Sequence, residues 1–179
     1  MSTTFKPQPE KKMPLPLDTN APDDFDFIIG DWAVKHRRLN ARFAKCQDWT
    51  EFDGLSSTVK TLGGFGNLED NLLYFPDGAF RAIAIRSFCT SAKAWSIWWL
   101  DGRNPTSLDV PVSGRFSDHV GLFFADDVLD GQPIKVRFTW MARPGGNPRW
   151  EQAFSKDAGA DGETTWETNW TMEFVPRMS

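Results

Sequence analysis

Apolar and polar residues alternate at a period of two over most of this chain, and turn residues interrupt the alternation at short intervals. In the segment PIKVRFTWM (133–141), for example, every second residue from Ile134 is apolar, and the residues between are charged or hydroxylated. This period predicts β-strands that bury one face. Roughly ten such segments, with Gly, Pro, Asp or Asn about every 8–12 residues, are typical of an all-β sandwich or barrel.

Consecutive short strands favour antiparallel pairing as hairpins. Closure into a barrel removes the free edges that strands this apolar would otherwise expose. We therefore expect an all-β fold, an antiparallel up-and-down barrel of about ten strands, as a single domain over residues 24–176. Residues 1–23, rich in Pro, Lys and Asp, are expected to be a disordered leader. The segment 23–32 is expected to form a short N-terminal helix, with Asp23 or Asp24 as N-cap and Gly30 as its end.

The chain is rich in aromatic residues, with nine Trp and fifteen Phe but a single Tyr. Trp150, Trp166 and Trp170 alternate around one glycine- and aspartate-rich turn, and we expect all three to face the barrel interior. They would then either fill a core or wall a cavity. The turn itself resembles an Asp-box, S-x-D-x-G-x-T-W, with residues inserted after Gly159, which is a hairpin-folding device.

Composition argues against several classes of function. A net charge of −4 gives no basic field for nucleic acid, and no segment has the ~20 apolar residues of a membrane helix. The N-terminus lacks a secretory apolar run, so a cytoplasmic location is expected. Cys46 and Cys89 have no metal-ligand spacing and are expected to be free thiols. With only His36 and His119 and no nucleophile-elbow motif, the sequence predicts no metal and no cofactor, and favours a binding protein over an enzyme.

The motif Gly30-Asp31-Trp32 resembles the Gly-x-Trp opening of lipocalin-like (calycin) barrels. Together with SIWWLDGRNP (96–105), RWEQAFS (149–155) and TWETNWTM (165–172), it makes the region from Phe25 to Phe174 similar to a bacterial lipocalin-like family of unknown function. The resemblance implies a barrel whose closed end is plugged by Trp32. It implies no catalytic residue.

Two other calycin groups differ from this chain at their functional residues. Nitrobindin-type haem barrels continue the opening motif as G-x-W-x-G-x-G and carry a late axial histidine, whereas here Ala33-Val34-Lys35 follows Trp32 and no histidine follows His119. Phenolic-acid decarboxylases of this shape depend on tyrosines, and this chain has only Tyr74. Neither haem binding nor decarboxylation carries over.

The residues expected to contact a ligand inside the barrel are His36, Arg38, Arg86, Trp99, Trp140, Trp150, Gln152 and Trp170. His36 and Arg38 share the phase of Trp32, although the basic run 35–38 could equally be a solvated patch at the barrel mouth. An arginine there could clamp a carboxylate in bidentate fashion.

Arg86 follows two alanines, Ala82 and Ala84, on one face of its strand, and the small side chains would leave room for a ligand. The isoleucines on the opposite face have an equal claim to the interior. Gln152 could orient a ligand or bond another core polar group across its hairpin.

Three hypotheses follow. The leading one is a barrel that binds a small apolar or amphipathic molecule, with an acidic group as one option. The second is an enzyme in the same barrel, in which His36 works with Asp101 or Glu51 in acid–base chemistry. The third is a structural or interaction protein whose barrel is filled by its own side chains.

Two segments, 94–100 and 119–125, are apolar on both faces, so their outer faces need cover. The short N-terminal helix or a second copy of the chain could provide it. We expect the second copy, in a homodimer through Trp98, Leu100 and Phe123.

Overall fold

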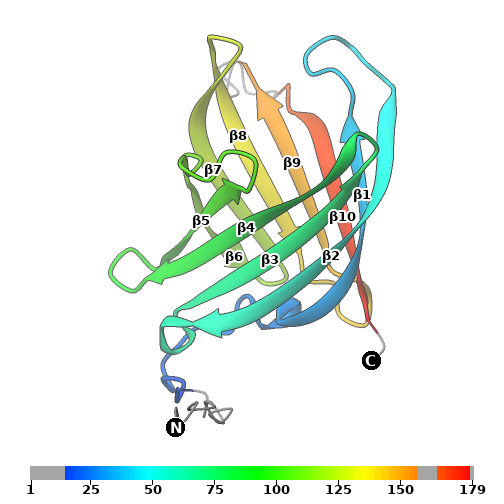
Figure 1. Cartoon of the computed structure of the whole chain (residues 1–179). Helices are drawn as coiled ribbons and strands as arrows, with labels where there is room; N and C mark the ends of the chain where they lie inside the picture. The colour runs from blue at the N-terminus through cyan, green and yellow to red at the C-terminus, as the bar shows by residue number, and fades with distance from the viewer. Residues whose placement is uncertain (1–14, 157–164, 178–179) are drawn as a thin grey trace, which may run out of the picture.

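Ten strands close into an antiparallel barrel in the computed structural model, which describes residues 15–156 and 165–177 (Figure 1). The strands are β1 (Gly30–Leu39), β2 (Trp49–Thr61), β3 (Gly66–Phe75), β4 (Gly78–Cys89), β5 (Ala94–Asp101), β6 (Val112–Ser117), β7 (Val120–Leu129), β8 (Gln132–Met141), β9 (Arg149–Ser155) and β10 (Glu167–Pro176). Each strand pairs with its neighbours in sequence, and β1 closes the ring against β10. This confirms the all-β, antiparallel up-and-down barrel predicted from the alternation.

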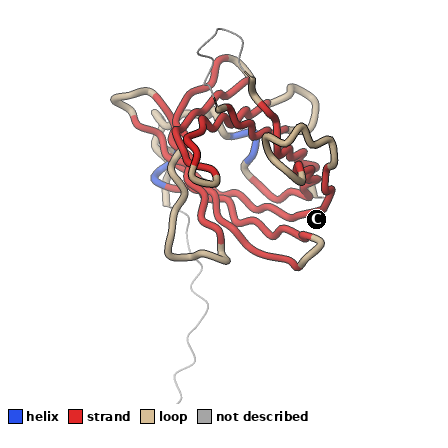
Figure 2. The backbone as a smooth tube through the Cα atoms, turned by 90° about the horizontal axis from the view of Figure 1, so that it is seen from above, coloured by secondary structure: helices blue, strands red, loops and turns tan. Residues whose placement is uncertain are grey.

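One end of the barrel is plugged by the segment that precedes β1. Phe25 and Ile28 are 2% and 0% exposed there, and the Phe25 ring packs edge-on against Trp95 at 5.0 Å. In Figure 2 a helical turn (blue) lies across the interior of the ring of strands. We call this the closed end. The opposite end, where β1 leads into the loop 40–48 and β5 into the loop 102–111, is the open end.

The expected N-terminal helix is reduced to a single 3₁₀ turn, η1 (Asp26–Ile28). Its N-cap residue is Phe25, which makes no side-chain capping bond. Asp24, expected as a possible cap, instead accepts a hydrogen bond of 2.9 Å from the indole N–H of Trp95. The acidic side chain therefore ties the segment to β5 and does not start a helix.

Trp32 lies at the closed end, but it supports the plug and does not form its centre. Its indole N–H donates to the carbonyl of Ile28 at 2.8 Å, and its ring meets Phe174 edge-on. Trp32 is only partly buried, whereas Phe25 and Ile28 are fully buried. The hydrogen bond ties the plug to β1.

The leader predicted for residues 1–23 falls partly outside the described residues, which begin at Leu15. Within the described part, the backbone N–H of Asp18 donates to the carbonyl of Gly63 at 2.7 Å, in the 3₁₀ turn η2 (Leu62–Gly64) between β2 and β3. The Asp-box-like turn lies largely in residues 157–164, also outside the described residues. No helix in the described part of the chain is long and apolar enough to span a membrane.

Trp166 lies outside the barrel, contrary to the prediction from alternation. The register of β10 shifts between Thr168 and Trp170, as in a β-bulge, where two residues on one strand face one on the other. The faces before and after the shift are therefore exchanged. Trp170 points inward as expected, while Trp166 packs on the outward side chains of Phe124, at 6.1 Å, and Arg137, at 4.6 Å.

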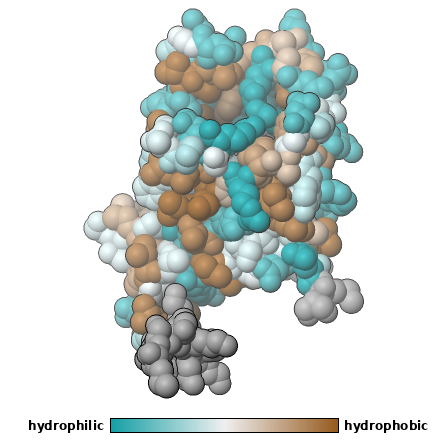
Figure 3. Space-filling view, viewed as in Figure 1, coloured by the Kyte–Doolittle hydropathy of each residue, from teal (hydrophilic) through white to brown (hydrophobic). Residues whose placement is uncertain are grey.

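Phe123 also differs from its prediction as a dimer contact. It is 0% exposed and stacks on Phe25 at a centroid distance of 6.0 Å, whereas its neighbour Phe124 is 47% exposed on the outer face. Both faces of β7 are apolar, so the alternation alone could not show which face the plug would occupy. Trp98 and Leu100 are half-buried and alternate along β5 with the buried Trp95 and Ile97. Figure 3 shows hydrophobic residues gathered over the wall of β3, β4 and β5.

Candidate functional site

An apolar cavity of about 120 Å³ lies inside the barrel. Among the residues that line it are six of the eight predicted ligand contacts, namely Arg86, Trp99, Trp140, Trp150, Gln152 and Trp170. A buried apolar cavity of roughly 150 Å³ is enough to hold benzene. This cavity has space for about one ring. A second pocket, of about 320 Å³, lies at the open end and is lined by Arg38, Arg42 and Asp77 among others.

The cavity wall is built from aromatic rings held edge to face. Trp170 meets Trp99 at 6.4 Å and Trp150 at 6.0 Å, with interplanar angles of 74° and 81°. Trp150 meets Phe138 at 4.9 Å and 74°. Edge-to-face contacts are favourable and directional, so each ring restricts its neighbour and the wall is formed before any ligand binds.

The cavity reaches the barrel wall where β5 and β6 separate. Their pairing ends at Ile97 and Val112, and the next contact is an isolated bridge at Leu100 and Leu108. Asp109, in this gap, lines the cavity. Burial raises the pKa of the Asp109 carboxyl, and the nearby carboxylates Asp127 and Asp101 raise it further.

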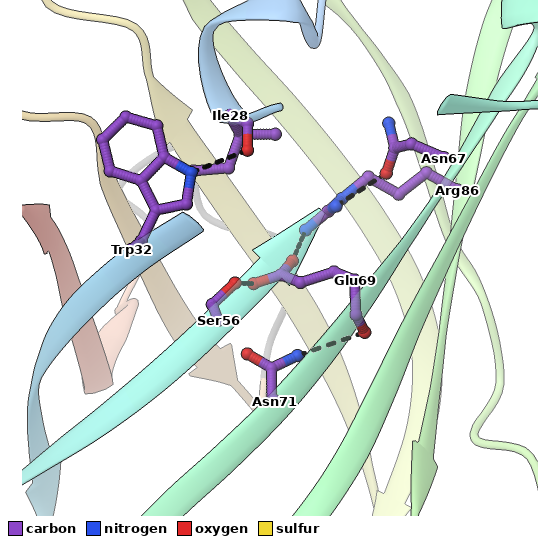
Figure 4. Close-up of polar contacts among 7 residues, drawn as sticks. All are labelled: Ile28, Trp32, Ser56, Asn67, Glu69, Asn71 and Arg86. Carbon is purple, nitrogen blue, oxygen red and sulfur yellow. Dashed lines mark hydrogen bonds and ion pairs between the residues drawn. The ribbon is translucent and has the colours of Figure 1, made fainter. Parts of the chain in front are cut away.

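A buried polar cluster of Ser56, Asn67, Glu69 and Arg86 lies at one side of the cavity (Figure 4). The Arg86 guanidinium forms an ion pair with Glu69 and donates to Oδ1 of Asn67 at 2.8 Å. The Ser56 hydroxyl donates to the other Glu69 oxygen at 2.7 Å. The face of β4 that carries Ala82 and Ala84 is thus the inner one. Arg86 lies on this face, and Glu69 neutralises its charge.

The Arg86 guanidinium also packs on two aromatic rings, 5.1 Å from the Phe25 centroid and 4.9 Å from the Trp140 centroid. Cation–π contacts of this kind stabilise a desolvated cation. Arg86 therefore contacts both the plug, at Phe25, and the cavity wall, at Trp140.

His36 lies behind the cavity wall and does not line it. The imidazole stacks on Phe52 at 4.6 Å and 5°, and its Nδ1 accepts the indole N–H of Trp170 at 3.3 Å. Gly54 makes room for it, because a Cβ there would stand 2.6 Å from Nε2. Burial lowers the pKa of His36 to about 4, with the carboxylate of Asp53 acting in the opposite direction. A neutral His36 thus positions Trp170.

Arg38 lies near the open end, above the same tryptophan. Its guanidinium is 5.3 Å from the centroid of Trp170 and 5.5 Å from that of Phe75. Within residues 15–156 and 165–177, Arg38 makes no salt bridge. Burial lowers the pKa of Arg38, and the neighbouring Arg42 and Arg103 lower it further, against the effect of Asp101. Arg38 is a partly desolvated cation with surplus positive charge around it.

Within the basic run 35–38, two side chains face outward and two face the barrel interior. Lys35 and Arg37 point outward and pair across strands with Asp53 and Glu51, at 2.7 and 2.9 Å. The alternate residues His36 and Arg38 point inward.

The carboxylates predicted to work with His36 are engaged elsewhere. Glu51 pairs with Arg37 on the outer surface. Asp101 binds Arg103 at 2.6 Å, and hydrogen bonds from Arg103 lower the pKa of Asp101. The described residues thus do not form the proposed acid–base pair.

The partners of Arg86 could not be found from the sequence. In β3 the inward residues Asn67 and Glu69 are polar, while the outward Leu68 and Leu72 are apolar, which is the reverse of the expected pattern. The one hint in the sequence of a polar interior is the inner face of β2. Its small and hydroxyl residues, Gly54 and Ser56, leave room for polar side chains from the neighbouring strand.

No protein-family model matches the chain, and no curated protein sequence matches it.

Proposed function

We propose that this protein binds a small aromatic acid, with its ring in the tryptophan-walled cavity and its acidic group at Arg38. One observation carries the proposal: Trp170 is at once a wall of a ring-sized cavity and the surface under an arginine that makes no salt bridge within the described residues.

The charge at Arg38 favours an anion over a neutral ligand. A half-buried guanidinium loses hydration, and a carboxylate or phenolate restores both the counter-charge and the hydrogen bonds. Arg42 lines the pocket at the open end together with Arg38, and its positive charge adds to the attraction. Arg86 is a weaker anchor for an acid, because Glu69 already neutralises it.

The volume of the cavity favours a ligand of one ring. Pockets for drug-sized ligands measure roughly 300–1,000 Å³, which is more than twice the volume of the tryptophan-walled cavity. This argues for a monocyclic ligand and against a long acyl chain.

Lipocalin-like ancestry is a proposal of the same kind. It is supported by the Gly-x-Trp motif at the start of β1, at the closed end of a ten-stranded barrel.

Titration with benzoate and with its neutral analogue benzamide, followed by tryptophan fluorescence and calorimetry, tests the function. We expect benzoate to bind more tightly at neutral pH, with an affinity that falls as salt is added. If neither compound nor benzene binds at millimolar concentration, the cavity is not a ligand site and the proposal is overturned.

A further inference from the structure

Two buried N–H groups at the cavity have no hydrogen-bond acceptor among the residues that the structure describes. They are Nε of Arg86 and the indole Nε1 of Trp140. Both residues line the cavity and are among the largest fully buried side chains of the protein. The residues are 2% and 1% exposed. Leaving a buried donor unpaired costs about 1–3 kcal/mol, so two beside one cavity need an explanation.

Arg86 and Trp140 lie side by side in the cavity lining, at the end nearest the plug, since both contact Phe25. The Arg86 guanidinium carbon lies 4.9 Å from the Trp140 ring centroid, so the two groups are in contact. The other nitrogens of Arg86 are occupied, one by Asn67 and one by Glu69.

This end of the cavity offers hydrogen bonds without net charge. Glu69 neutralises Arg86, and its second oxygen is taken by Ser56. A second anion would meet the buried Glu69 carboxylate without gaining a free cation, whereas a neutral acceptor would satisfy the donors at no such cost.

We infer that the ligand carries a neutral hydrogen-bond acceptor at its buried end, such as a carbonyl oxygen or a nitrile nitrogen, received by Arg86 and Trp140. This rests on the proposed function. The ligand would then be bipolar, with an acid toward Arg38, a ring between the tryptophans, and an acceptor against the polar cluster.

A pair of isosteric probes isolates the buried contact. The compounds 4-cyanobenzoate and 4-ethynylbenzoate share the acid, the ring and the linear substituent, and differ in a terminal nitrogen against a terminal C–H. We expect the nitrile to bind about tenfold more tightly, the value of one to two neutral hydrogen bonds. The C≡N stretching band of the bound nitrile should also move to higher wavenumber, as it does on hydrogen bonding.

Trp140→Phe removes the indole donor and keeps an aromatic ring against Phe25 and Arg86. In this variant the preference for the nitrile should fall severalfold and the band should shift back. Trp150→Phe is the matched control, because it makes the same change in the same wall. It should weaken both probes alike and leave their ratio unchanged.

The outcomes separate the two proposals. If neither probe binds, the ligand-binding function fails. If both bind with equal affinity in the unaltered protein, the function stands and the acceptor is rejected, as it would be if an ordered water satisfied both donors. A ratio that survives Trp140→Phe also overturns the assignment to Trp140.

Discussion

The indole N–H of Trp170 donates to Nδ1 of His36 at 3.3 Å, which joins the cavity wall to a buried, neutral histidine. Because a protonated imidazole has no free lone pair, this bond exists only while His36 is neutral. The same tryptophan lies under Arg38. Neutral His36 thus holds the Trp170 ring in place. That ring is both a wall of the cavity and the surface under Arg38, where we propose that the acidic group binds.

Acidification should destabilise the fold through His36. Its pKa is about 4 in the folded protein against 6.5 ordinarily, so the unfolded chain binds the proton first. The stability that neutral His36 contributes is therefore complete above pH 6.5 and is lost as pH falls toward 4, on the order of 3 kcal/mol in all. Urea unfolding of the unaltered protein and of His36→Gln across this range measures it, with the exposed His119→Gln as control. A constant difference between the first two proteins would contradict this account.

Arg38→Gln should weaken benzoate binding about tenfold and benzamide binding little, because a charge-assisted hydrogen bond contributes about 1.5–3 kcal/mol. Arg37→Gln is the matched control. It removes the same charge from the outer face of the barrel, where Arg37 pairs with Glu51. Calorimetry of both variants with both ligands decides the point. An equal loss for acid and amide would show that Arg38 acts only through packing.

The ion pair of Glu69 and Arg86 should show strong coupling. Glu69→Leu or Arg86→Met alone strands a buried charge, at a cost of about 3–5 kcal/mol. The double variant removes both charges and should cost clearly less than the sum. A double-mutant cycle by urea unfolding measures the coupling, and additive costs would mean that water already solvates the pair.

Phe25→Ala should destabilise the barrel more than Trp32→Ala. Phe25 is fully buried among rings, and truncation of such a residue costs about 3–5 kcal/mol. Trp32 is partly exposed and should cost less, through its packing and its bond to Ile28. The free energies of unfolding of the two variants test this order. A larger loss for Trp32→Ala would show that Trp32, and not Phe25, is the centre of the plug.

Self-association through the outer wall at Trp98 and Leu100 remains a prediction. If a second copy covers this surface, sedimentation at tens of micromolar should show a dimer, and Trp98→Lys should give a monomer. Val59→Lys, on the exposed outer face of β2 and outside both of these apolar segments, should leave the dimer intact. A monomer in the unaltered protein would contradict the prediction.

The period-two alternation by itself determined the all-β class, the approximate number of strands and the antiparallel order. It also placed Trp140, Trp150 and Trp170 inside. These features are local: side chains of a strand alternate, and wherever only one face is apolar that face is buried. Six of the predicted ligand contacts meet at one cavity for this reason.

Tertiary structure alone decided the rest. Phe123 turned inward because both faces of its strand were apolar and only the Phe25 plug distinguished them. Trp166 turned outward because a bulge, set by pairing with β9, exchanged the faces. The partners Glu69 and Arg86 come from different strands, and their meeting depends on the register of β3 with β4. Alternation specifies a face, whereas register, bulges and the plug specify neighbours, and the chemistry of the site depends on neighbours.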